Sequence, residues 1–179
     1  MADEVEVNQH STESIGAQTV RMTNSSAHSI EANQVEMTQS SAHSIEADRV
    51  ELRQSAGQTV DADSIEMHQS AAALIDADTL RLKQSLAVGA RAATLQVEQS
   101  LVSTVQTQDA TLADSAVVVL AGNRVQAANV NTVFLIGREI EGEVKTMLDT
   151  RGAVIFGVVA GCLLGFFSLL SGIVRRARR

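Results

Sequence analysis

The sequence predicts an all-β fold, a triangular β-solenoid of about nine fifteen-residue coils, followed by a single C-terminal transmembrane α-helix. Two observations predict the solenoid. The chain superimposes on itself when it is shifted by fifteen residues, and each unit divides into three groups of five whose first and third positions are apolar or small. A third observation, an uncharged run of 23 residues near the end of the chain, predicts the helix.

The unit at residues 35–49, VEMTQ SSAHS IEADR, shows how a coil is built. Alternate side chains of a strand point to opposite faces, so the first and third positions of each five face inward and the second faces outward. Positions four and five then turn the corner. We call the fives that begin at Val5, Val20, Val35 and their repeats the first side, and the next two fives the second and third sides. Stacked coils pair as strands about 4.8 Å apart.

The inward columns repeat their residue types from coil to coil. The first side carries Val, Leu or Met, the second Ser and Ala, and the third Ile and Ala. The register continues in a more degenerate form to Leu135 and Gly137; the alternative is that it fails beyond Gln108 and the later residues form an irregular core. A corner column is expected to form an amide ladder of stacked side chains, from Gln9 and Asn24 through Gln39, Gln54, Gln69, Gln84 and Gln99.

Composition fits a thin repeat better than a compact globular domain. The 179 residues include no Pro, Trp or Tyr and only four Phe. Residues 1–151 hold all 21 acids and 10 of the 14 bases, a net charge of −11, so we expect no nucleic-acid binding. The single cysteine, Cys162, can form no internal disulfide. No catalytic set, phosphate-binding loop or cofactor motif is visible, and we expect neither an enzyme nor a cofactor.

The third side carries a predicted acidic face in two neighbouring outward columns. Like charges stacked at the coil spacing repel one another, so a divalent cation, a basic partner, or solvent and salt must offset them. His28 and His43 should lie one above the other on the second side, exposed, with His68 on a different side. The acidic face consists of Glu31, Glu46, Asp61 and Asp76 in one column and Asp48, Asp63 and Asp78 in the other.

The second side changes character along the chain, from Ser, His and Glu to apolar residues. An apolar strip on the outside of a rod indicates a contact surface, and parallel packing of identical rods is its simplest use. We call this set the apolar strip: Leu74, Leu86, Val88, Leu101, Val118, Val119, Val133 and Phe134. At the other end, the first coil places His10 and Thr12 at inward positions, so it is either a frayed end or an end-to-end contact with a second copy.

The last forty residues lie outside the repeat. Helical spacing of Ile140, Val144, Met147 and Leu148 predicts that residues 138–151 form a juxtamembrane amphipathic helix after a solenoid at 1–137. Residues 152–174 form the predicted transmembrane helix, long enough to cross a hydrocarbon layer of about 30 Å. Within it Gly157, Gly161 and Gly165 stand four apart, the spacing of helix–helix contacts.

The basic tail, residues 175–179, gives conflicting signals about topology. Arg175, Arg176, Arg178 and Arg179 favour the cytoplasmic face, which would place the rod outside. No leading signal segment is visible, which favours a tail-anchored protein whose rod stays in the cytoplasm. We expect the second arrangement, with the arginines holding lipid headgroups, and placement outside remains the alternative.

The stacked short coils, written V-x-M-x-x-S-x-A-x-x-I-x-A over residues 5–139, resemble the bactofilins in architecture. That resemblance implies a membrane-associated solenoid that polymerises end to end without a nucleotide. The chain differs from that family in its fifteen-residue coil and its C-terminal membrane segment. Our first hypothesis is a membrane-anchored structural protein whose rods self-associate as a scaffold or spacer. The second is a binding or adhesion module that uses the acidic face, and the third and weakest is an enzyme.

Overall fold

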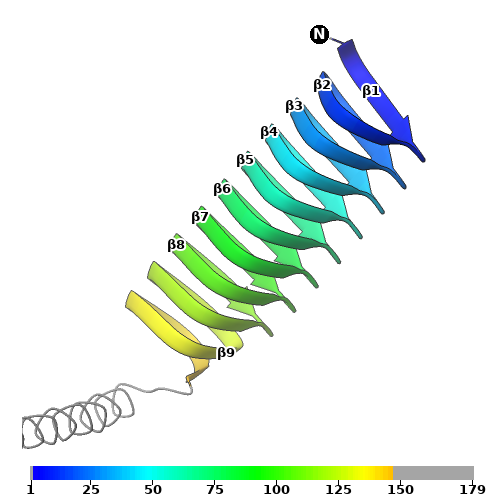
Figure 1. Ribbon diagram of the computed structural model, residues 1–179. Coiled ribbons are helices and arrows are strands. Elements are labelled where there is room, and N and C mark those ends of the chain that lie inside the picture. Colours follow the sequence, from blue (N-terminus) through cyan, green and yellow to red (C-terminus); the bar gives the residue numbers. More distant parts are fainter. Residues whose placement is uncertain (1, 147–179) are drawn as a thin grey trace, which may run out of the picture. The chain divides into compact units, whose positions relative to one another are not determined.

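The computed structural model describes residues 2–146, with side chains described for residues 3–142, and these residues form a nine-stranded parallel β-solenoid (Figure 1). The strands pair in the order of the sequence, each with the strand one coil further along. They are β1 (Ala2–Asn8), β2 (Ser11–Thr23), β3 (Ser26–Thr38), β4 (Ser41–Arg53), β5 (Ala56–His68), β6 (Ala71–Lys83), β7 (Leu86–Glu98), β8 (Leu101–Ala113) and β9 (Ala116–Thr146).

The register confirms the fifteen-residue period. Between β3 and β4, for example, Ile30 pairs with Ile45 and Val35 with Val50, and the same offset holds for every pair of neighbouring strands. The structure has about eight turns of this length, where the sequence predicts about nine. Pairing skips the fourth residue of the second and third sides, such as His43 and Asp48, and stops at the end of the first side. The ladder is thus interrupted three times per turn, as a three-sided coil requires.

The corner between the first and second sides has a left-handed backbone. One residue in each coil adopts a φ between 48° and 55° at this corner; β1 to β8 each end just before such a residue, and the last one, Asn129, lies within β9. A left-handed conformation costs an ordinary L-residue about 1–2 kcal/mol, so the corner needs compensating interactions. The residues are those of the predicted amide ladder, extended by two: Gln9, Asn24, Gln39, Gln54, Gln69, Gln84, Gln99, Asp114 and Asn129.

The core is a stack of the predicted inward columns. On the first side Val35, Met37, Val50 and Leu52 are completely buried, and the inward serines of the second side, from Ser25 to Ser115, are at most 7% exposed. Between the inward positions every second residue faces solvent, which gives the alternating burial pattern of β2 to β8. Because each inward residue lies above one of its own kind, the interior fills without aromatic side chains.

The repeat continues beyond Gln108, so the alternative of an irregular core there is wrong. Strand β8 pairs with β9 in the same register, through Val105 with Leu120 and Leu112 with Ala127. Leu112, Leu120 and Val125 are at most 1% exposed, as inward residues should be.

The predicted helix at residues 138–151 is wrong for its described part, because β9 continues to Thr146. Arg124 binds Glu139 fifteen residues later, with 3.4 Å between Nε and Oε2, so this segment lies one coil above residues 122–127. Gly142 has a φ of 108°, and a Cβ there would overlap the backbone of Ala127. The free edge of the preceding coil offers backbone partners that override the local helical spacing. Residues 147–151 lie outside the described residues.

The first coil is less well buried than the others. Val5 and Val7 are half-buried and His10 is exposed, whereas the equivalent valines and methionines of later coils are completely buried. The expectation of a wetter first coil is therefore confirmed.

The predicted membrane segment, residues 152–174 with Gly157, Gly161 and Gly165, lies outside the described residues, as does the tail with its four arginines. Within residues 2–146 there is no helix of the length and apolar character that crossing a membrane demands.

Candidate functional surfaces

The second side has an outer surface almost without charge. Its outward and corner residues, three per coil over nine coils, include one carboxylate, Glu13, and two histidines, His28 and His43. All the other charged residues between Asp3 and Glu141 belong to the first and third sides. One of them, Asp114, stands at the left-handed corner, the last position of its first side. We call this outer surface of the second side the uncharged side.

The apolar strip occupies the C-terminal half of the uncharged side, where the sequence places it. Leu74 and Val88 are each 56% exposed, and Phe134 is 50% exposed. Leu86, Leu101 and Val118 are also exposed, while Val119 and Val133 are half-buried. Six of the eight predicted residues thus present large apolar side chains to solvent. Their role in self-association stays a prediction.

The strip is continuous from coil to coil. Leu86 pairs with Leu101, and Leu101 with Ala116, so one column runs unbroken from β7 to β9. Leu74 pairs with Gly89, and a Cβ at Gly89 would lie 3.3 Å from Cδ1 of Leu74. Leu74 therefore leans over the glycine that follows it in the same column and covers the space left there.

Two exposed apolar residues were not included in the predicted strip. Ile136 is 68% exposed and Ile140 is 44% exposed. Ile136 continues the outward column of Glu31 on the third side, and Ile140 stands at an inward position of the last described coil. The fifteen-residue period places Ile136 at an outward position and so could have identified it, whereas it places Ile140 inward, and the exposure of Ile140 does not follow from the period.

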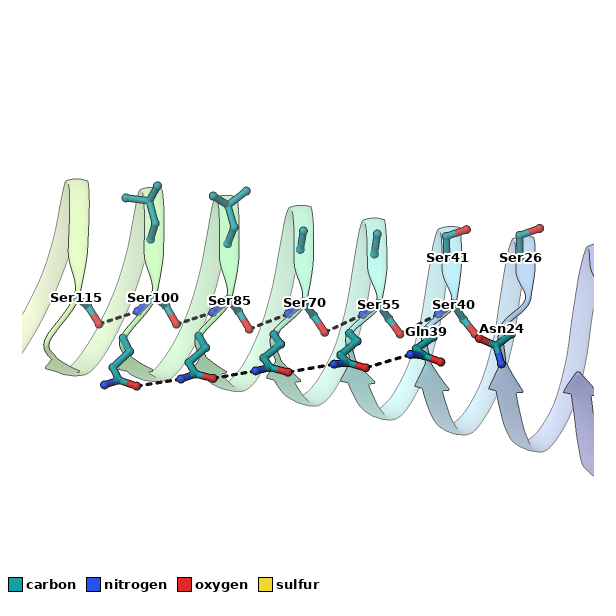
Figure 2. A pocket seen from close by; sticks show the side chains of 18 of the residues that line it. Asn24, Ser26, Gln39, Ser40, Ser41, Ser55, Ser70, Ser85, Ser100 and Ser115 are labelled. Carbon is teal, nitrogen blue, oxygen red and sulfur yellow. Dashed lines mark hydrogen bonds between the residues drawn. The ribbon is translucent and has the colours of Figure 1, made fainter. Parts of the chain in front are cut away.

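A groove runs along the left-handed corner, beside the uncharged side (Figure 2). It has a volume of about 1140 Å³ and extends from Gln9 in the first coil to Asn131 in β9. The corner amides form one wall and the outward column of the second side forms the other, beginning with Ser26 and Ser41 and ending with Leu86, Leu101 and Ala116. Apart from His10 and Asp114, no titratable side chain lines it.

The amide wall of the groove is hydrogen-bonded along the rod axis. Nε2 of Gln39 donates to Oε1 of Gln54 at 3.4 Å, and the same bond recurs from Gln54 through Gln69 and Gln84 to Gln99, at 3.2 to 3.3 Å. Asn129 donates to Asp114 at 2.8 Å in the same column. The predicted amide ladder is confirmed from Gln39 to Gln99.

A second ladder, of serine hydroxyls, lies behind the amides (Figure 2). The sequence alone indicates only that these serines are small residues that let the coil close. Oγ of Ser70 lies 2.8 Å from the carbonyl oxygen of His68, to which it donates, and accepts the backbone N–H of Ser55 at 3.2 Å. Equivalent bonds connect the serines from Ser25 to Ser115. These hydroxyls satisfy backbone groups that the corner takes out of the strand ladder.

The acidic face lies where the sequence predicts it, with all seven carboxylates exposed. Several of them line a shallow groove of about 320 Å³ on the third side, together with Ala17, Ala32, Ala47 and Ala62. Asp76 is 3.6 Å from Nη1 of Arg91, which follows it in the column. The other six form no ion pair within the described residues. Among these residues no group of three or more His, Cys, Asp or Glu side chains is arranged to hold a metal ion.

The histidines stack as expected. The rings of His28 and His43 lie with their centroids 4.7 Å apart and their planes 8° from parallel, and both side chains are exposed. His68 lies on the first side, where its Nε2 is 2.9 Å from Oε1 of Glu66. That hydrogen bond lowers the pKa of Glu66 below its ordinary value.

Comparison with known proteins gave no match. No family model, no curated protein and no solved structure is detectably similar to this chain.

Proposed function

We propose that the protein is a membrane-anchored structural protein whose solenoid rods self-associate into an oligomer, array or filament that serves as a scaffold or spacer. The observation that supports this best is the uncharged side with its apolar strip, because large exposed apolar patches on soluble domains mark contact surfaces. The bactofilin-like architecture supports the same reading. A straight stack of coils can act as a spacer without any chemistry of its own.

The strip alone supports only weak association. Covering the five exposed leucine and valine side chains of the strip, about 50 Å² each, contributes on the order of 6 kcal/mol per partner. The loss of rotational and translational freedom costs about 4–15 kcal/mol, so little net affinity remains for two free rods. The proposed membrane helix at 152–174 removes much of that cost, since chains held in one bilayer meet at high effective concentration. Contacts at Gly157, Gly161 and Gly165 would add to it.

Sedimentation velocity of the full chain in mild detergent tests self-association. We expect the natural sequence to form oligomers and the triple variant Leu86→Ser, Leu101→Ser, Val118→Ser to shift strongly towards monomer. The matched control changes three exposed acids, Glu46→Ser, Asp61→Ser and Asp76→Ser, and should leave oligomers intact. A natural chain that sediments only as a monomer would overturn the proposal.

A second candidate function is recognition of a basic partner or a divalent cation by the acidic face. It is favoured by one observation: six of the seven stacked carboxylates form no ion pair among the described residues. Neighbouring coils bring these carboxylates about 4.8 Å apart, so a bound cation or basic surface would relieve their mutual repulsion.

Charge reversal separates the two functions. Glu46→Lys, Asp61→Lys and Asp76→Lys together should abolish binding of Ca²⁺ or of a lysine-rich peptide, measured by titration calorimetry, while oligomers persist. If the natural chain binds neither ligand, the acidic face serves solubility alone.

A further inference from the structure

The groove beside the uncharged side is long, straight and repeats with the pitch of the coils. It runs from the first coil to β9, and its walls are the same two columns throughout (Figure 2). A ligand that fills it must be equally long and must repeat at the same spacing of about 4.8 Å. A second copy of this rod meets both conditions.

From this geometry we infer that a second copy docks on the uncharged side with the two rods parallel and in register, related by a two-fold axis along the rods. This inference rests on the proposed self-association and specifies its surface and direction. The outward column of each rod, from Ser26 to Ala116, then lies along the corner groove of its partner. Such a contact is isologous and closes as a dimer.

Charge selects this side over the other two. The outer first side alternates acids and bases, with Glu36, Glu51, Arg53 and Lys83 among them, and the outer third side carries the acidic face. Parallel docking on either would place identical charges opposite one another, which is destabilising. On the uncharged side and its groove only two carboxylates, Glu13 in the first coil and Asp114 in the groove wall, would come near their own copies, and solvent reaches both.

The outward residues of the uncharged side change from polar to apolar along the rod, and this change favours parallel over antiparallel docking. The first coils present serines with His28 and His43, while the later coils present the apolar strip. Parallel rods place polar coils on polar coils and the strip on the strip. Fully overlapped antiparallel rods would press leucines onto histidines and serines, which desolvates polar groups without giving them partners.

The buried interface area argues against the remaining arrangement, in which antiparallel rods overlap only along the apolar strip. Five coils span about 24 Å and one side with its corners is about 15 Å wide, so that overlap buries roughly 700 Å² in total. Overlap along about eight coils buries roughly 1,150 Å², which lies close to the lower end of the range for specific interfaces, about 1,200–2,000 Å².

Ala71 and Ala116 are suitable positions for a cysteine crosslinking test. Both lie in the outward column, three coils apart, which is roughly 14 Å at the coil spacing. Each is changed to cysteine in the full chain, on a Cys162→Ser background, and treated with a short bifunctional maleimide in mild detergent. A maleimide is needed because facing sheets pack about 10 Å apart, beyond the reach of a disulfide. The control is Gln96→Cys, exposed on the first side.

In-register parallel rods predict crosslinked dimers of Ala71→Cys alone and of Ala116→Cys alone, and none of Gln96→Cys. Antiparallel rods centred on the five-coil strip place 71 opposite 131 and 116 opposite 86, so they predict no product from either variant, and antiparallel rods overlapped only from the coil of 71 to that of 116 predict a product only when the two variants are mixed. Mixed-only products, or oligomers without any crosslink at either alanine, overturn the inference and leave the proposed function standing. A chain that is monomeric by sedimentation overturns both.

Glu13 gives an independent readout that does not depend on a crosslinker. Glu13→Gln removes one of the two like-charge pairs of the parallel interface, the other being Asp114 in the groove wall, and should tighten dimer formation about two- to fivefold at low salt. The control Glu6→Gln removes a neighbouring exposed charge on the first side. No difference between the two variants would count against the parallel arrangement, because antiparallel rods that overlap along the strip leave Glu13 outside their contact.

Discussion

The inside and the outside of the coil use the same residue types for different purposes. Within β6, Leu82 is 1% exposed and Leu74 is 56% exposed, and in β9 the adjacent Val117 and Val118 are 2% and 41% exposed. The inward member of each pair fills the core and is determined by the fold. The outward member contributes little to the fold, so its apolar character calls for another explanation, and self-association supplies one.

The two leucines of β6 should show the largest difference. Leu82→Ala leaves a cavity between coils that cannot collapse easily, and should cost about 2–5 kcal/mol of unfolding free energy. Leu74→Ala, at an exposed site, should stay within about 0.5 kcal/mol. Urea unfolding of dilute full-length protein, followed by circular dichroism, measures both. A large loss at Leu74 under monomeric conditions would mean that it supports the fold, and the apolar strip would lose its meaning as a free surface.

The inward columns were predictable because sequence alternation and the fifteen-residue period report the same geometry twice. A residue such as Leu112 has no distinctive local context, yet its column identifies it as buried, and the structure agrees. The period also predicted the amide ladder and the stacked rings of His28 and His43, since vertical neighbours follow from register alone.

What the sequence did not reveal depends on the corner geometry and on the end of the stack. The hydroxyl of Ser70 bonds to His68 and Ser55 only because a left-handed residue turns the backbone between the two sides. Past Arg138 the spacing of Ile140 and Val144 indicates a helix, and only the free edge of the coil below makes β9 continue. Such long-range backbone pairing overrides a local pattern.

A buried and an exposed serine allow the same comparison of inside and outside, with a smaller expected loss of unfolding free energy. Ser70→Ala leaves the N–H of Ser55 without its partner in a buried corner, and should cost about 1–3 kcal/mol. Ser41→Ala changes an exposed serine of the second side and should be neutral within about 0.5 kcal/mol. The same unfolding measurement applies. Equal, small effects would show that the buried hydroxyl ladder contributes no more than the outward serines.

The corner column lies between inside and outside, and Gln69 separates its two contributions. The side chain is exposed, but it accepts from Gln54 at 3.3 Å and donates to Gln84 at 3.2 Å. Gln69→Ala keeps the left-handed backbone and loses both bonds, so it should cost about 1 kcal/mol. Gln69→Gly loses the same bonds but relieves the left-handed strain, about 1–2 kcal/mol, against a greater loss of chain entropy, about 0.5–1 kcal/mol.

Glycine at position 69 should therefore be near neutral, and more stable than alanine by about 1 kcal/mol, in the same urea titration. If alanine equals the natural glutamine, the amide ladder does not stabilise the rod. The glutamines would then hold a strained conformation without local compensation. A column of strained residues that the fold does not need is more typical of a contact surface. The corner groove would then be interpreted, like the apolar strip, as a surface for contact rather than as support for the fold.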